Sequence, residues 1–177
     1  MPPSDHSPCL LHQYLNRVGT RLYKLLDNGG IEAENLSYES LVQGRILLGE
    51  GAIWTRGGVA RIDVSEQLAV VDQTAAGPWV KRKNYSYHAT LVTIEDAEEV
   101  GNIRRYDSPH DSLSGPDYHF EHHVHCYWPF SDKDEEIWTL EEEGTPTLAE
   151  FVEDILEWQE NHYEELKPSG WKEAGCL

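Results

Sequence analysis

The chain has 177 residues, of which 39% are hydrophobic, and its 32 acidic and 14 basic residues give a formal net charge of −18. No apolar run approaches the roughly 20 residues of a membrane-spanning helix, so we expect no membrane partner. The acidic surplus argues against broad, nonspecific nucleic-acid binding. An acid-rich, lysine-poor composition is typical of a halophilic cytosol, where high salt screens the self-repulsion.

The N-terminal residues lack the basic start and the apolar segment of a secretion signal, so we expect a cytoplasmic protein. Cys9, Cys126 and Cys176 lie far apart and form no C-x-x-C pair. This spacing favours neither a disulfide framework nor a structural zinc knuckle.

Residues 1–7 are expected to be disordered, and Ser7-Pro8 has the pattern of a helix start. Apolar residues then recur at helical spacing until Asn28-Gly29-Gly30 ends the helix. A second, short helix is predicted around Tyr38 to Val42. The sequence therefore indicates a helical N-terminal extension over residues 8–43.

From Gly44 the apolar pattern changes to that of strands, with a hairpin signal at Gly57-Gly58. Thr147 and Glu150 form a capping box that opens a helix reaching about Glu165. The predicted strands are 46–48, 52–54, 59–64, 68–71, 85–94, 101–106, 119–128 and 136–140. We therefore expect an α+β fold in which residues 44–166 form an antiparallel sheet with a closing C-terminal helix, and the helix of residues 8–43 flanks this sheet as well. Residues 167–177 are expected to form a loose tail.

Five of the nine histidines fall between positions 110 and 125. Alternation along the strand at 119–128 puts His122 on a mostly apolar face, where we expect a buried or half-buried histidine with a hydrogen-bonded partner. His123 and His125 fall on the other face, about 7 Å apart along the strand.

Three interpretations of His123 and His125 remain open. They lie on a polar sheet face in water, or they bind a metal ion at an open site together with Asp107, His110 or Glu121. The third interpretation is metal-independent acid–base chemistry that needs no cofactor. RNA cleavage requires a base for the 2′-hydroxyl, an acid for the leaving 5′-oxygen and a cation for the phosphorane charge.

Pairing of residues 103–107 with 119–128 as a hairpin would bring the required groups together. In this hypothesis His110 and one histidine of the pair share the acid and base roles, Arg105 stabilises the phosphate, and Asp107 orients a histidine or the arginine. Alternation separates Arg104 and Tyr106 from Arg105 and Asp107, and the sequence does not tell which pair faces the site. The candidate catalytic residues are Arg105, Tyr106, Asp107, His110, His123 and His125, and the candidate metal ligands are Asp107, His123 and His125.

The chain from Gly44 to about Trp158 resembles the TumE-type toxins, which are encoded beside a helix-turn-helix antitoxin. The resemblance lies in Arg45 to Trp54, in Arg105-Tyr-Asp107 with His110, in His123-x-His125 and in the closing segment Thr147 to Ile155. The helix within residues 8–27 is an addition to that pattern, and the loop between Asp107 and His123 is longer.

This resemblance implies the toxin component of a toxin–antitoxin pair, with a small helix-turn-helix protein as its cognate antitoxin. RNA is the candidate substrate of the acid–base interpretation of the histidines. Two alternatives belong to other classes. One is a non-catalytic module that binds a partner protein, and the other is a metal-dependent hydrolase built on the His123-x-His125 pair.

Overall fold

The structure is a computed structural model that describes residues 7–41, 44–92, 99–109, 121–130 and 133–166. Nearly all of the predicted disordered N-terminus and the whole predicted tail over 167–177 lie outside these residues. Within them, the elements in chain order are β1 (Cys9–Leu10), α1 (Leu11–Asp27), β2 (Ile31–Glu34), β3 (Ser37–Leu41), β4 (Ile46–Thr55), the 3₁₀ turn η1 (Arg56–Gly58), β5 (Ala60–Thr74), β6 (Gly77–Val92), β7 (Glu99–Asp107), β8 (His122–Cys126), β9 (Glu136–Leu140), η2 (Glu142–Gly144), α2 (Leu148–Asn161) and α3 (Tyr163–Leu166).

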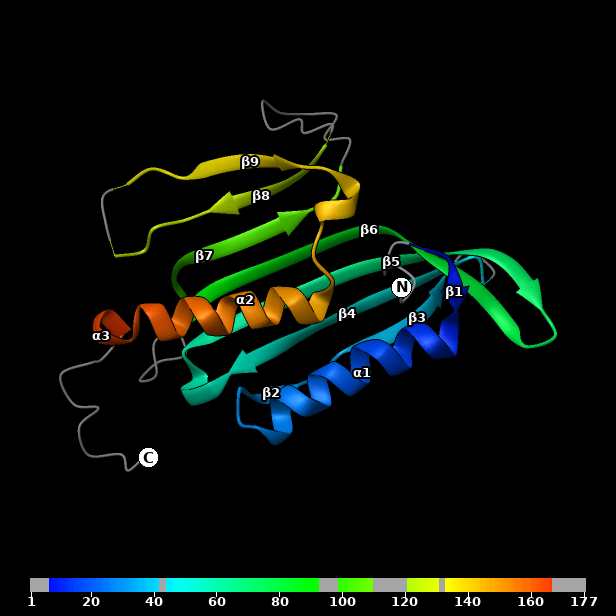
Figure 1. The fold of residues 1–177 in the computed structure, drawn as a ribbon, viewed down its shortest axis with the longest axis horizontal. Coiled ribbons are helices and arrows are strands. Elements are labelled where there is room, and N and C mark those ends of the chain that lie inside the picture. The colour runs from blue at the N-terminus through cyan, green and yellow to red at the C-terminus, as the bar shows by residue number, and fades with distance from the viewer. Residues whose placement is uncertain (1–6, 42–43, 93–98, 110–120, 131–132, 167–177) are drawn as a thin grey trace.

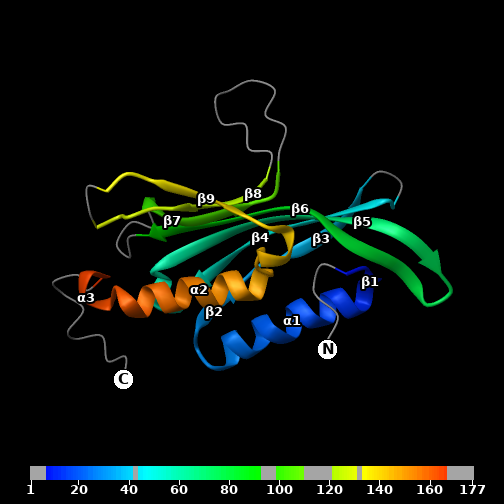
Figure 2. The same cartoon turned by 45° about the horizontal axis from the view of Figure 1, so that its top comes forward.

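One antiparallel sheet joins all the described strands in the order β2-β4-β5-β6-β7-β8-β9, with β1 paired to β6 and β3 paired to β4. Helices α1 and α2 lie side by side against the same face of this sheet (Figures 1 and 2). The predicted α+β class, with a helix at each end of the chain flanking an antiparallel sheet, is therefore confirmed. None of the described helices is long and apolar enough to cross a membrane.

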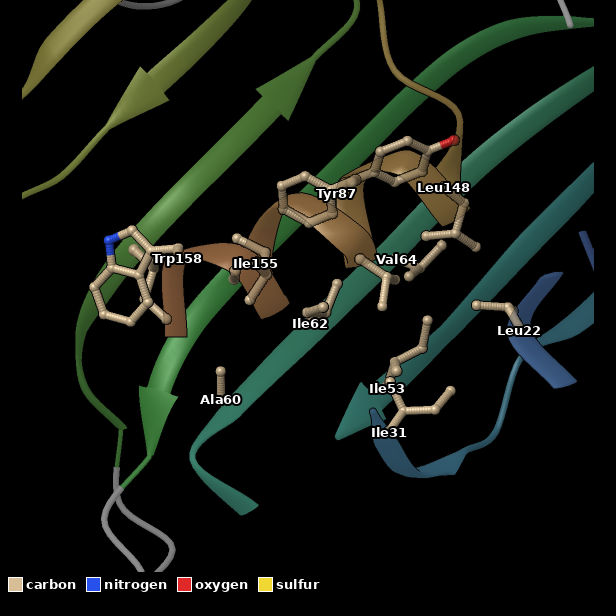
Figure 3. Close-up of a cluster of buried hydrophobic side chains, with 14 of the residues drawn as sticks. Leu22, Ile31, Ile53, Ala60, Ile62, Val64, Tyr87, Leu148, Ile155 and Trp158 are labelled. Atoms are coloured by element: carbon tan, nitrogen blue, oxygen red, sulfur yellow. The ribbon is translucent and has the colours of Figure 1, made fainter. Parts of the chain in front are cut away.

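The hydrophobic core lies between this face of the sheet and the two helices. Inward side chains of β4, β5 and β6, including Ile53, Ile62 and Tyr87, meet Leu148 and Ile155 of α2 there (Figure 3). The predicted alternation of Tyr85, Tyr87, Ala89 and Leu91 is confirmed, since all four are buried. Each large apolar side chain removed from water in this way stabilises the fold by about 1.5–3 kcal/mol.

The start of α2 follows the predicted capping box. The hydroxyl of Thr147 accepts a hydrogen bond from the backbone N–H of Glu150, and the Glu150 carboxylate accepts one from the backbone N–H of Thr147 at 2.8 Å. This reciprocal cap fixes where α2 begins and hence which of its residues face the sheet.

The N-terminal segment differs from the prediction in two places. Helix α1 begins at Leu11, because Cys9 and Leu10 pair with Val80 and Trp79 of β6 instead of opening the helix. The segment around Tyr38, predicted as a helix, is strand β3.

Pairing with β4 explains this second difference. The ring of Tyr38 lies over Gly49, where any side chain would collide with it. Residues 8–43 therefore add strands as well as a helix, and those strands extend the same sheet. Pairing with the next strand in the chain outweighs the local helical spacing here.

The strands are longer than the glycine pattern suggested. β4 runs unbroken through Gly49, and β5 joins two segments that were predicted as separate strands. The predicted hairpin at Gly57-Gly58 is confirmed, because both glycines have positive φ (73° and 62°) in the turn between β4 and β5.

Candidate functional site

Strands β7 and β8 pair antiparallel, which is the arrangement that the hypothesis from the sequence required. In its register Arg105 lies opposite His125, and Asp107 lies opposite His123. Directly opposed side chains project from the same face of a sheet. The register therefore brings all four of these side chains to one face.

That face points away from the helices. On the other face the Arg104 guanidinium donates to both carboxylate oxygens of Asp154 in α2, at 2.7 and 2.6 Å, and the Tyr106 ring packs edge-on against Phe151 at 5.4 Å. Burial, followed by the nearby Asp154 carboxylate, raises the pKa of Tyr106. Placing Tyr106 in the site was wrong, because its ring belongs to the α2 side of the sheet.

The four side chains on the opposite face, Arg105, Asp107, His123 and His125, are called here the Asp107 cluster. Oδ2 of Asp107 lies 2.6 Å from Nε of Arg105, 3.7 Å from Nε2 of His123 and 3.9 Å from Nε2 of His125. The two imidazole rings meet edge to face with their centroids 4.9 Å apart. A single carboxylate oxygen is thus the common centre of one guanidinium and two imidazoles.

The four side chains of the Asp107 cluster differ strongly in how far they are exposed to solvent. The side chain of His123 is 0% exposed and that of Asp107 is 4% exposed, whereas His125 is 12% and Arg105 is 40% exposed. The interpretation of His123 as part of a polar face in water is therefore wrong. A buried carboxylate needs a positive partner, and Arg105 supplies one.

The outer nitrogen of each imidazole is held by an acceptor. Nδ1 of His123 donates to the backbone carbonyl of Glu121 at 2.9 Å, and Nδ1 of His125 donates to the carboxylate of Glu135. Burial acts to raise the pKa of Glu135, but hydrogen bonds from His125 and Tyr127 outweigh it, so that this pKa is lowered. Glu135 is therefore ionised at neutral pH and can only accept, which places the proton on Nδ1 of His125.

Two residues that were not among the sequence candidates belong to the surroundings of the cluster. Tyr127 stacks on His125 with 6.2 Å between ring centroids and 10° between ring planes. Burial and its interaction with Glu135 raise the pKa of Tyr127 to about 12. Tyr127 could have been found by continuing the alternation of His123 and His125, whereas Glu135 precedes β9 and no local pattern marks it.

Two other sequence candidates have different outcomes. His110 lies outside the described residues, so its predicted acid–base role stays a prediction. His122 is the half-buried histidine that was expected. Its Nδ1 lies 3.0 Å from the hydroxyl of Tyr85, and the two rings stack 5.6 Å apart.

The donor set of the cluster is one that metal ions use. Asp107, His123 and His125, the three metal candidates from the sequence, bring their ligand atoms within 4.8 Å of one another. Two imidazole nitrogens and one carboxylate oxygen form the protein part of open catalytic zinc sites and of facial iron sites.

Comparison of the chain with protein-family models, with curated proteins and with solved structures finds no match. The resemblance to the TumE-type toxins therefore stays a prediction from the sequence motifs.

Proposed function

We propose that this protein is the toxin component of a toxin–antitoxin pair and that it cleaves RNA at the Asp107 cluster. One observation supports the catalytic part most directly. Arg105, His123 and His125 surround a single carboxylate oxygen on one face of the sheet. Phosphodiester cleavage needs a cation and a proton-transfer centre next to each other, and this cluster supplies both.

Arg105 is the phosphate-binding residue in this proposal. Its side chain is 40% exposed, while its Nε lies 2.6 Å from Asp107. A guanidinium has five N–H donors in a planar fork that suits phosphate oxygens. Asp107 thus orients Arg105, and Arg105 stabilises the charge that develops on the phosphorane.

His125 is the histidine of the pair that meets the substrate, because it reaches the surface while His123 is enclosed. During cleavage the 2′-hydroxyl loses its proton to the site, and the 2′-oxygen forms a bond to phosphorus. The bond from phosphorus to the 5′-oxygen then breaks, and that oxygen takes up the proton that the site received from the 2′-hydroxyl. Glu135 and Tyr127 hold the His125 ring in place for this step.

The net charge of −18 limits how RNA binds. Most of the surface repels a polyanion, so the contact has to be local and centred on Arg105. This fits a nuclease that acts on a short single-stranded stretch of RNA better than a protein that covers a long duplex.

A non-catalytic binding module is the second candidate, and edge strand β9 favours it. Ile137 and Trp138 of β9 are 45% and 55% exposed. An edge strand with exposed apolar side chains is a ready surface for another protein. In a toxin this surface would suit the antitoxin, and in a non-catalytic protein it would be the functional site itself.

Induced expression tests the proposal. Growth and total RNA are followed for the wild type, for Asp107→Asn and for His125→Gln. His122→Gln is the matched control, since it alters a histidine of the same strand on the opposite face. We expect arrest with RNA loss for the wild type and the control, and neither effect for the two cluster variants at equal amounts of folded protein.

Arrest in all four strains without RNA loss would overturn the ribonuclease and favour the binding module. Absence of arrest in every strain would contradict the toxin assignment as well.

A further inference from the structure

Both imidazoles of the Asp107 cluster turn the same nitrogen inward. The Glu121 carbonyl and the Glu135 carboxylate are acceptors, so each hydrogen bond places a proton on Nδ1. A neutral imidazole protonated at Nδ1 carries its lone pair on Nε2. The two Nε2 atoms are the ones that face Oδ2 of Asp107.

Three electron-rich atoms thus converge on one small region. The distances from Oδ2 to the two Nε2 atoms are 3.7 and 3.9 Å, and the three ligand atoms all lie within 4.8 Å of one another. Two ligands of one tetrahedral zinc ion, each about 2.1 Å from it, are about 3.4 Å apart. Small side-chain rotations would therefore bring these atoms to bonding distance from a common ion.

The hydrogen-bond acceptors of the two Nδ1–H groups are of the kind that usually hold metal-binding histidines in place. Histidines that bind metal usually donate their other ring N–H to a carboxylate or a backbone carbonyl. In this protein His125 donates to Glu135 and His123 donates to the Glu121 carbonyl. Such partners fix the ring orientation and make Nε2 a better ligand.

We infer that Asp107, His123 and His125 bind one divalent transition-metal ion through Oδ2 and the two Nε2 atoms. Two imidazoles and a carboxylate suit zinc, and they leave coordination positions for water. Arg105 contacts the same carboxylate oxygen, whose second lone pair remains available to the ion. The inference rests on the site of the proposed function and supplies its proton-transfer group, because metal-bound water loses its proton near neutral pH.

This inference changes one expectation from the sequence, which favoured a metal-independent reaction. Nε2 of His125 cannot both bind a metal ion and transfer a proton. With an ion bound, His125 would be held as a ligand, and the hydroxide that a bound water forms on losing its proton would accept the proton of the 2′-hydroxyl.

Equilibrium metal binding tests the inference without any assay of activity. The full chain, without a histidine tag, is stripped with a chelator and dialysed against zinc chloride, and its zinc content is measured. Cobalt(II) is then titrated into stripped protein, since the intensity of its visible absorption reports the coordination number. Wild type, Asp107→Asn, His125→Gln, Glu135→Gln and the control His122→Gln are compared, and circular dichroism checks that each is folded.

We expect one equivalent of zinc in the wild type and in His122→Gln. His125→Gln and Asp107→Asn should lose at least a hundredfold in affinity. Glu135→Gln should lose about 10- to 100-fold, which is the usual effect of removing the partner of a histidine ligand.

Zinc binding that is absent from the wild type, or equally strong in the folded His125→Gln and Asp107→Asn variants, would overturn the inference. Loss of metal binding and loss of RNA cleavage are separable. Zinc bound by the cluster without RNA cleavage would refute the ribonuclease and leave the metal site standing. Cleavage that persists in stripped protein would leave the ribonuclease standing and overturn the role of the ion in proton transfer.

Discussion

Nε2 of His123 lies 3.7 Å from Oδ2 of Asp107, directly across the β7–β8 pair. This contact depends on the register of the hairpin. A slip by one residue would turn His123 toward α2 and bring His122 or Val124 to the carboxylate instead. The candidate site is therefore a property of strand pairing as much as of residue type.

Replacing one tyrosine on each face of the β7–β8 pair should show which face carries the activity. Tyr106→Phe should leave RNA cleavage within about twofold of the wild type, because its ring packs on Phe151 away from the cluster. Tyr127→Phe removes the hydroxyl that acts on Glu135 and should slow cleavage about 10-fold or more, in the range for partners of active-site groups. Initial rates on one RNA substrate, at matched protein concentration, provide the comparison. Equal losses in both variants would refute the assignment of faces.

The ion pair between Arg104 and Asp154 should contribute to stability and not to activity. Both side chains are partly exposed, at 24% and 34%, so we expect a coupling energy of about 1 kcal/mol that decreases as potassium chloride rises. A double-mutant cycle with Arg104→Met and Asp154→Asn, followed by denaturant unfolding, measures it. A coupling energy of zero at low salt would show that the pair contributes nothing to holding α2 on the sheet.

A buried carboxylate on β5 should be sensitive to loss of its donors. Glu66 is 1% exposed and accepts hydrogen bonds from the hydroxyl of Tyr87 at 2.6 Å and that of Tyr38 at 3.0 Å. Tyr87→Phe leaves the carboxylate with one donor fewer and should cost about 1–3 kcal/mol of unfolding free energy. Tyr23→Phe, at an exposed position of α1, is the control and should change stability by less than about 0.5 kcal/mol. Similar costs for the two substitutions would contradict the role given to Glu66.

The cap of α2 predicts a dependence of stability on pH. Burial acts to raise the pKa of Glu150, but hydrogen bonds from Thr147 outweigh it, so the pKa in the folded chain lies below its ordinary value of 4.5. A lowered pKa means that the ionised carboxylate stabilises the fold above about pH 4.5 and that this contribution is lost as the pH falls through the folded-state pKa. The stability difference between wild type and Glu150→Gln should therefore shrink on acidification from pH 6 to about pH 3. A difference that stays constant over this range would argue against the cap as its source.

Local patterns in the sequence were enough to predict much of the sheet. The two-residue period of Tyr85 to Leu91 gave the buried face of β6, and Thr147 with Glu150 gave the start of α2. These signals are contained within a few neighbouring residues, so no tertiary contact was needed to recognise them.

Features that depend on contacts with another strand or helix were missed. The pattern around Tyr38 resembled a helix, but pairing with β4 makes it a strand. Alternation separated Arg104 from Arg105 without telling which one faces the core. Asp154 on α2 decides that question by pairing with Arg104, and no local pattern reports such a contact.

The residues of the candidate site also divide into those that local patterns predict and those that only contacts between elements reveal. Arg105, Asp107, His123 and His125 could be named because two strands carry them at alternating positions. Glu135 contacts His125 from the segment before β9, and only the fold reveals it.

Cleavage of a labelled single-stranded RNA by the purified chain tests the central claim most directly. The assay compares the wild type with His125→Gln and with His122→Gln, in zinc-containing buffer with high potassium chloride. We predict cleavage by the wild type and by His122→Gln, and a rate lower by at least about 100-fold for His125→Gln. Equal rates for the folded His125→Gln variant and the wild type, or no cleavage by any of the three folded proteins, would contradict the Asp107 cluster as a ribonuclease site.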